Sequence, residues 1–169
     1  TVSHFGENTS TVYCDYDEQG NLLRQEYPED GRCTDYTYDE FGNVLTVVTG
    51  DGSAFRYEYT YDEGGRILVQ MEYLGENPVG RLEKEYDEQG REVATAYFYP
   101  DGSVNYTTVT TYAGDTETRT SFRADGTAYL TQITVTDAHG NILSRETWQG
   151  DVMVSRTENT YEEIEMIAQ

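Results

Sequence analysis

Short runs of alternating side chains fill most of the chain. In residues 56–62, Tyr57, Tyr59 and Tyr61 fall on one face of an extended strand, and the charged and polar residues fall on the other. Residues 104–112 show the same alternation. Clusters of Gly, Asp and Pro separate the runs, as turns separate strands. The pattern predicts an all-β chain, with no helix before the last few residues.

One hexapeptide, Tyr-Asp-Glu-X-Gly-Asn or -Arg, recurs between these runs. Full copies begin at Tyr16, Tyr38, Tyr61 and Tyr86, a degenerate copy begins at Thr136, and vestigial copies begin at Tyr112 and Tyr161. The first residues of successive copies lie 22 to 26 positions apart, which is typical of a repeat architecture.

The hexapeptide has the chemistry of a turn. Its Asp side chain can bond to backbone two residues on, and its Gly takes a positive φ at no steric cost. We therefore expect a type I turn, a left-handed Gly and a bulge at each copy. A small cation site on the Asp and Glu is the alternative. It is disfavoured because one turn offers too few oxygens for calcium, which takes about 6 to 8.

A second kind of turn, built on Asp-Gly, lies between the hexapeptides. It occurs at residues 28–31, 50–53, 100–103 and 124–127, and as Gln-Gly-Asp at residues 149–151. Asp-Gly between β-rich runs is a strong hairpin signal. In the third repeat we expect a longer loop at residues 74–80 instead. That loop is either a tolerated insertion or a place where function has been added.

Together these signals predict an antiparallel up-and-down meander of about 12 or 13 short strands, made from hairpin repeats of about 22 to 26 residues. We expect a curled, largely single-layer sheet, because wide open sheets twist and curl; a closed or rolled barrel is the alternative. An apolar column should form the spine of the sheet: Leu23, Leu45, Leu68, Val93 and Leu143.

We expect a single domain over residues 1–169, since its length is near the usual size of one domain. We expect residues 1–10 to be an irregular lead-in, with an extra edge strand as the alternative, residues 11–161 to be the hairpin repeats, and residues 162–169 to be a tail or closing strand.

Composition adds limits on the core and on the partners. Leu, Ile, Val and Phe together make up less than one fifth of the chain, so the core should be thin, although 16 Tyr in periodic positions argue against disorder. The net charge of −21 argues against nucleic acid and anionic membrane surfaces as partners.

No apolar run is long enough for a membrane helix. Cys14 and Cys33 should be free thiols, since an intervening strand separates them.

The Tyr-Asp-X-X-Gly-Asn hexapeptide, followed by Leu or Val and then an Asp-Gly turn, resembles the bacterial YD or RHS-type repeat over residues 13–161. This resemblance implies a β-hairpin array that is secreted or exposed at the cell surface. The largest such proteins wind their strands into a shell around a toxic domain. This chain is far too short to enclose a cargo. Short arrays in lipoproteins are similar, and a removed lipoprotein signal would fit a start at Thr1.

Candidate chemistry is sparse. His4 lies in the unpatterned lead-in, and His139 occupies the variable position of a hexapeptide. We see no nucleophile–base–orienter set, no His or Cys cluster for a metal, and no phosphate-binding loop, so we predict no catalytic residue, metal or cofactor.

Three functions compete. The first is a non-catalytic extracytoplasmic scaffold or protein-interaction surface, with another protein or a second copy paired at the sheet edges. The alternative is a carbohydrate-binding module whose exposed aromatic rings stack on sugars, with these candidates: Tyr57, Tyr59, Tyr97, Tyr99 and Trp148. The third is a hydrolase that joins an Asp or Glu with His139 or Cys14.

Overall fold

The computed structural model describes residues 2–5 and 8–161, and the side chains from residue 11 to residue 161. It assigns fifteen strands to these residues and no helix. The strands are β1 (Val2–Phe5), β2 (Asn8–Thr11), β3 (Tyr13–Tyr16), β4 (Leu22–Tyr27), β5 (Arg32–Tyr38), β6 (Val44–Thr49), β7 (Ala54–Tyr61), β8 (Ile67–Leu74), β9 (Asn77–Tyr86), β10 (Glu92–Phe98), β11 (Val104–Ala113), β12 (Thr116–Arg123), β13 (Ala128–Thr136), β14 (Ile142–Gln149) and β15 (Val152–Glu158).

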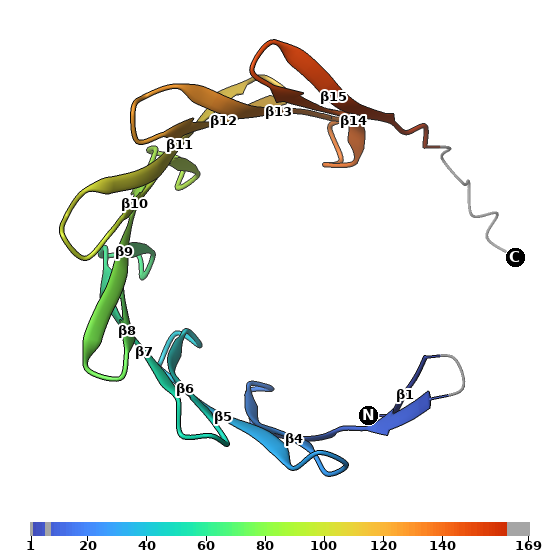
Figure 1. The fold of residues 1–169 in the computed structure, drawn as a ribbon. Helices are drawn as coiled ribbons and strands as arrows, with labels where there is room; N and C mark the ends of the chain where they lie inside the picture. The colour runs from blue at the N-terminus through green and yellow to red at the C-terminus, as the bar shows by residue number, and fades with distance from the viewer. Residues whose placement is uncertain (1, 6–7, 162–169) are drawn as a thin grey trace, which may run out of the picture. The chain divides into compact units, whose positions relative to one another are not determined.

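Thirteen of these strands form one antiparallel meander, in which each strand from β3 to β15 is hydrogen-bonded to its neighbours in sequence (Figure 1). The predicted all-β up-and-down sheet is confirmed. The sheet is open within the described residues, because β3 and β15 stand at the two ends of the strand order. The alternative of a closed barrel is therefore wrong.

The first residues differ from the expectation. Residues 1–10 were expected to be an irregular lead-in, but β1 and β2 pair into a separate two-stranded sheet, with Val2 opposite Thr11 and Phe5 opposite Asn8. Strands of only four residues carry little periodic signal, so the alternation pattern does not predict them. The predicted tail or closing strand at residues 162–169 lies outside the described residues.

Close contacts divide the chain into two compact units. One comprises Thr1–Glu83 with Tyr99–Asp101, and the other comprises Lys84–Phe98 with Gly102–Gln169. Within each unit, taken by itself, successive strands follow an arc in Figure 1, as expected for a curled single layer. That the chain is one domain stays a prediction.

The four full copies of the hexapeptide and the degenerate copy at Thr136 form the predicted turn. In the first copy, Gly20 N donates to Asp17 O at 3.2 Å and Asp17 N donates to Asn21 O at 2.9 Å, and Gly20 has a φ of 91°. The Asp17 carboxylate binds its own turn, since Oδ1 accepts from Gln19 N at 3.0 Å and Asn21 N at 2.7 Å. The same backbone pair and the same Asx bonds recur at the later copies: Asp39, Asp62, Asp87 and Asp137.

These bonds hold the turn carboxylates in their ionised form. The pKa of Asp17 lies below its usual value of 3.8, chiefly because the Asn21 side chain donates to the carboxylate, with the two backbone N–H groups adding to the effect. The pKa values of the other four turn Asp residues are lowered as well.

The apolar column has a different role from the one expected. Tyr16 pairs with Leu22 while Asp15 pairs with Arg24, so Leu23 is the extra residue of a β-bulge. The equivalent bulges place Leu45, Leu68 and Leu143 in the same position. Leu23 is 40% exposed and Leu143 is 38% exposed, so the column is not a buried spine. The prediction rested on the fixed spacing after the hexapeptide Gly, and that spacing marks the bulge position rather than a buried column.

The hydroxyls of three tyrosines at the start of hexapeptide copies bind a carbonyl of the preceding repeat. Tyr38 Oη donates to Leu22 O at 2.8 Å, and Tyr112 Oη donates to Glu92 O at 3.1 Å. Tyr161 Oη donates in the same way to Ile142 O, at 3.2 Å. In each case the acceptor is the first residue after a hexapeptide, beside the bulge. The hexapeptide Tyr therefore satisfies a backbone carbonyl of the preceding repeat.

The second series of turns contains one correction. The segment at residues 74–80 is not a longer loop. Leu74 pairs with Asn77, so only Gly75 and Glu76 form the connection, and β9 begins at once. Gly75 has a φ of 59°, whereas Glu76 does not have a positive φ. A positive φ at the first central residue alone is typical of a type II′ turn. The vestigial copy at Tyr112 is likewise closed by a two-residue turn, with Ala113 opposite Thr116.

The thin core predicted from composition is confirmed. No hydrophobic side chain is fully buried among the residues whose side chains are described. The buried polar residues are Thr95, Thr108 and Thr110, all on β10 and β11. The sheet is therefore held together by backbone hydrogen bonds, cross-strand side-chain pairs and turn chemistry rather than by a hydrophobic interior.

Replacing Tyr38 with Phe should destabilise the chain by about 0.5 to 1.5 kcal/mol, because Leu22 O loses its hydroxyl donor while the ring is kept. The midpoint of urea unfolding measures this. The matched control is Tyr36→Phe, on the same strand, for which the expected change is smaller than about 0.5 kcal/mol. Equal losses in the two variants would contradict the role given to the Tyr38 hydroxyl.

Acid should destabilise the fold through the turn carboxylates. Their folded-state pKa values are lowered, so their contribution is complete above the unfolded value of 3.8 and is lost as the pH falls through the folded values. We expect the urea midpoint to be level from about pH 7 to 5 and to fall below that.

The Asp17→Asn variant should show a shallower acid decline than the unmodified chain, because Asn keeps the acceptor oxygen and removes the titrating group. Asp15→Asn, on the exposed part of β3, is the control and should leave the acid decline unchanged. A decline that Asp17→Asn does not alter would exclude this carboxylate as a cause.

Candidate functional site

Two of the aromatic candidates, Tyr57 and Tyr59, lie on β7. Tyr57, Tyr59 and Tyr61 share a face, as predicted, and Tyr59 stacks on Tyr61 with ring centroids 5.9 Å apart. Tyr59 Oη donates to Val44 O at 2.8 Å. All three are half-buried, so their rings are largely used for packing within the sheet rather than presented as a sugar platform.

Tyr61 also contacts the second hexapeptide turn, at residues 38–43. Its ring meets Phe41 at a centroid distance of 4.7 Å, and its hydroxyl donates to the Asp39 carboxylate and accepts from Asn43 Nδ2. Burial and the nearby Asp39 carboxylate raise the pKa of Tyr61 to about 12. This cluster ties the second and third hexapeptides together.

The remaining aromatic candidates differ in their surroundings and their exposure. Tyr97 stacks on Tyr106 across β10 and β11, with centroids 5.7 Å apart and an interplanar angle of 5°. Trp148 is half-buried, and its Nε1 donates to Glu146 at 3.1 Å. Only Tyr99, at 47% exposure, presents an open ring among the five. The other four rings are therefore half-buried, in packing or hydrogen bonds within their own units.

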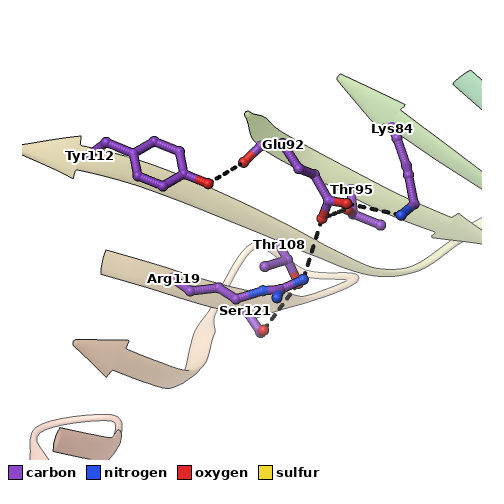
Figure 2. A network of polar contacts seen from close by, with 7 residues as sticks. All are labelled: Lys84, Glu92, Thr95, Thr108, Tyr112, Arg119 and Ser121. Atoms are coloured by element: carbon purple, nitrogen blue, oxygen red, sulfur yellow. Dashed lines mark hydrogen bonds and ion pairs between the residues drawn. The ribbon is translucent and has the colours of Figure 1, made fainter. Parts of the chain in front are cut away.

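A half-buried polar network on β9, β10 and β12 was not predicted from the sequence (Figure 2). Glu92 is its centre. Its Oε2 accepts from Lys84 Nζ at 2.9 Å, and its Oε1 accepts from Thr95 Oγ1 at 2.6 Å. Arg119 Nη2 completes the network at 3.3 Å from Oε1. Lys84 is the only lysine in the sequence.

Electrostatics favour the charged form of Glu92. Burial raises the pKa of its carboxyl group, but the bonds from Thr95 and Lys84 and the charge of Arg119 outweigh burial, and the pKa ends below its usual value. A carboxylate held in this way is a poor general acid or base near neutral pH. The network therefore fits a role in fixing the strands to one another.

The sequence carried a signal for this network that the repeat alignment exposes. Glu92 follows its hexapeptide directly, where the other repeats have Leu22, Val44, Ile67 and Ile142. Lys84 stands two residues before a hexapeptide Tyr, where other repeats have Tyr36 and Tyr59. Two charges of opposite sign that replace an aliphatic and an aromatic residue in one repeat indicate a paired substitution.

The groups considered for a hydrolase are not brought together. His139 is exposed at the tip of the turn after β13, where its backbone N donates to Asp137 Oδ1 at 2.9 Å. Cys14 and Cys33 are free thiols on β3 and β5, with β4 between them. His4 lies on β1. No group of three metal-ligating side chains occurs among the described residues.

Two hollows lie in the first unit. One, of about 560 Å³, follows the hexapeptide turns and includes Asp17, Leu23, Tyr36 and Phe41 in its lining. The other, of about 490 Å³, lies beside the Asp-Gly turns and includes Tyr27, Cys33 and Gly50. In the second hollow Gly50 N donates to Cys33 O at 2.9 Å, so the two strands are closely apposed there. Neither hollow gathers a set of catalytic side chains.

Residues 16–54 match the family model described as RHS Repeat. The predicted resemblance to YD or RHS-type repeat proteins is thereby confirmed. No curated protein sequence matches the chain. In the part of the chain that the structure describes, no helix has the length and apolar character needed to span a membrane.

Solved structures with a similar fold exist, and 41 chains match. One is a protein of unknown function from Bacteroides fragilis, which is 13% identical with a TM-score of 0.52, over 64% of this chain and 94% of that one. At this identity the likeness concerns the fold alone. Another belongs to the complex TcdB2-TccC3-Cdc42, at 13% identity and a TM-score of 0.32, over 85% of this chain and 11% of that one.

Replacing Glu92 with Gln should destabilise the second unit by about 1 kcal/mol, a figure discounted for the partial exposure of the network. The cause is the loss of the one carboxylate that Lys84 and Arg119 share. The loss should shrink at about 1 M salt, where the Debye length is about 3 Å. Thermal or urea unfolding followed by circular dichroism measures both effects.

Glu85→Gln provides the control on the neighbouring strand, since Glu85 is exposed and should tolerate the change within about 0.5 kcal/mol. An equal effect of the two substitutions, or a Glu92→Gln loss that does not respond to salt, would exclude an electrostatic role for the network.

Proposed function

We propose that this chain is a non-catalytic repeat module of an extracytoplasmic protein, where it serves as a structural scaffold and protein-interaction surface. The observation that carries the proposal is that the Asp, Gly and Tyr of the hexapeptide have structural roles. Its Asp and Gly close the turn, and its Tyr binds the preceding repeat, so these residues maintain the frame. The match to the RHS repeat model supports the same reading.

The Glu of the hexapeptide is exposed and does not take part in the turn. Glu18, Glu40, Glu63 and Glu88 are exposed at the turn tips, and neither the turn bonds nor the ion pairs of the described residues use them. With a net charge of −21, the module presents a strongly acidic surface. Such a surface repels nucleic acid and anionic lipid, and it steers cationic protein surfaces toward the sheet.

The extracytoplasmic setting, with a lipid anchor added when a signal segment is removed, is part of the proposal. They rest on the resemblance to YD or RHS-type repeats. Protease added to intact cells of the producing bacterium should degrade the chain while a cytoplasmic marker survives. Survival of the chain on intact cells, and degradation only after lysis, would contradict the surface location.

Carbohydrate binding is the weaker candidate, because four of its five proposed rings are half-buried in packing or hydrogen bonds. A glycan array distinguishes the two functions. Binding that is lost in Tyr99→Ala and kept in Tyr36→Ala would favour the carbohydrate module. An array without signal, together with a specific protein partner, favours the interaction surface.

The triple variant Glu18→Gln, Glu40→Gln, Glu63→Gln should bind a protein partner from the cell envelope about tenfold more weakly, without loss of stability, because these side chains contribute charge and no turn bonds. Quantitative cross-linking and unfolding midpoints measure the two effects.

The control triple variant Glu29→Gln, Glu76→Gln, Glu85→Gln removes the same charge from positions outside the hexapeptide turns. An equal loss of binding in the control would show that net charge alone acts. Unchanged binding in both variants would exclude the hexapeptide turn tips as the interaction surface.

A further inference from the structure

The edge strand β15 is unusually open. It ends the strand order, and all seven of its residues are exposed. Val152, Met153 and Val154 are 65%, 45% and 50% exposed, and they follow one another directly. Natural edge strands usually avoid such apolar runs, because unpaired backbone groups next to exposed apolar side chains promote pairing with another chain.

A bulge limits the part of β15 that could pair in a regular way. Trp148 pairs with Met153 but Thr147 pairs with Ser155, so Val154 is the extra residue. A bulge increases the local twist and ends regular pairing. The segment from Ser155 onward is free of such breaks, and its register with β14 is continuous to Glu158.

The backbone of this segment has a defined outward pattern. Asn159 N donates to Leu143 O at 2.9 Å, so Asn159 directs its backbone groups toward β14. In an antiparallel pair this direction alternates from residue to residue. The N–H and C=O groups of Arg156 and Glu158 therefore point away from β14, toward the open edge.

The same two residues carry complementary charges. Arg156 and Glu158 are 52% and 66% exposed on their side chains, and the Arg156 Nη2–Glu158 Oε1 distance is 2.5 Å. Arg156 Nη1 also lies 3.2 Å from Glu146 Oε1 on β14. When two identical strands pair antiparallel about the residue between an Arg and a Glu, the Arg of each strand lies opposite the Glu of the other. An Arg and a Glu two residues apart are therefore self-complementary in such a pair.

We propose that β15 pairs with β15 of a second copy of this chain, antiparallel and about a two-fold axis at Thr157. Arg156 then lies opposite Glu158 of the second copy, and Glu158 lies opposite its Arg156. Both are hydrogen-bonded pairs, in which the two residues exchange N–H···O bonds. This agrees with the N–H and C=O groups of Arg156 and Glu158 pointing toward the open edge. The contact is isologous and closes at two copies. This inference rests on the proposed function, since it identifies one partner of the interaction module.

The other edge strand offers no comparable match. β3 contains Asp15 as its one charged residue, so β3 can supply no cation to Glu158. Two copies of β3 would also place Asp15 near Asp15, and like charges across strands destabilise pairing. Self-complementary charge is therefore specific to β15 among the two edges of the large sheet.

Analytical ultracentrifugation of the chain at about 150 mM salt tests the pairing, since the Debye length of about 8 Å then screens the net negative charge of the two copies. One strand pair buries little surface, so we expect a monomer near 1 µM and a dimer on the order of 100 µM. Arg156→Glu should raise the dimer Kd about tenfold or more, because it places like charges opposite each other twice. The double variant Arg156→Glu, Glu158→Arg should restore the dimer.

Arg56→Glu is the matched control. Arg56 pairs with Glu58 at the same two-residue spacing, but on the interior strand β7, so its reversal should leave the dimer Kd unchanged. Circular dichroism shows whether each variant is folded, and Arg156→Gln replaces Arg156→Glu if the latter is not. Arg156→Gln should weaken the dimer by a smaller factor.

A chain that stays monomeric at about 300 µM would overturn the proposal, as would oligomers larger than a dimer. A dimer that tolerates Arg156→Glu, or a double variant that stays monomeric, would also overturn it. These outcomes leave the envelope-partner experiment intact, because that experiment alters the hexapeptide turns and not β15. Conversely, a dimer without envelope binding would contradict the proposed function alone.

Discussion

The hydrogen bonds between each hexapeptide Asp and its own turn are the interaction on which the rest of this sheet depends. One carboxylate oxygen of Asp17 accepts two backbone N–H groups, and the other accepts the Asn21 amide. In a protein with a hydrophobic interior, such turns would be one contribution among many. Here no apolar side chain is fully buried among the described ones, so every strand reversal has to be stabilised locally.

A single-layer sheet must also hold its repeats in register without a second layer. The Tyr hydroxyls do this by binding a carbonyl of the preceding repeat, as Tyr38 binds Leu22. In the fourth repeat Lys84, Glu92, Thr95 and Arg119 add a polar network between strands (Figure 2). These contacts are each worth little, and their sum is spread along the chain. Repeat arrays are stabilised in this way, by neighbour contacts rather than by one core.

The use of these side chains for structure also limits which functions the chain can have. Side chains that maintain the frame are not free for chemistry, which is why the recurring Asp and Tyr are poor candidates for a reaction. The exposed hexapeptide Glu residues at the turn tips and the two edges of the large sheet in the described residues remain available to partners. A surface of this kind suits binding to other proteins, and the charge pattern of β15 is the basis of the proposed pairing with a second copy.

The sequence by itself determined the hexapeptide turns, most strands of the large sheet and their order, because each of these depends on residues close together in the chain. The spans of β4 and β5 follow from the alternation between a hexapeptide and an Asp-Gly turn, and the Asx bonds of Asp17 follow from the hexapeptide alone. Only the tertiary structure decided the rest. It placed Leu23 in a bulge, gave the Tyr38 hydroxyl an acceptor in another repeat, and joined Glu92 to Arg119 across 27 positions. Those outcomes depend on cross-strand register, which the local pattern does not encode.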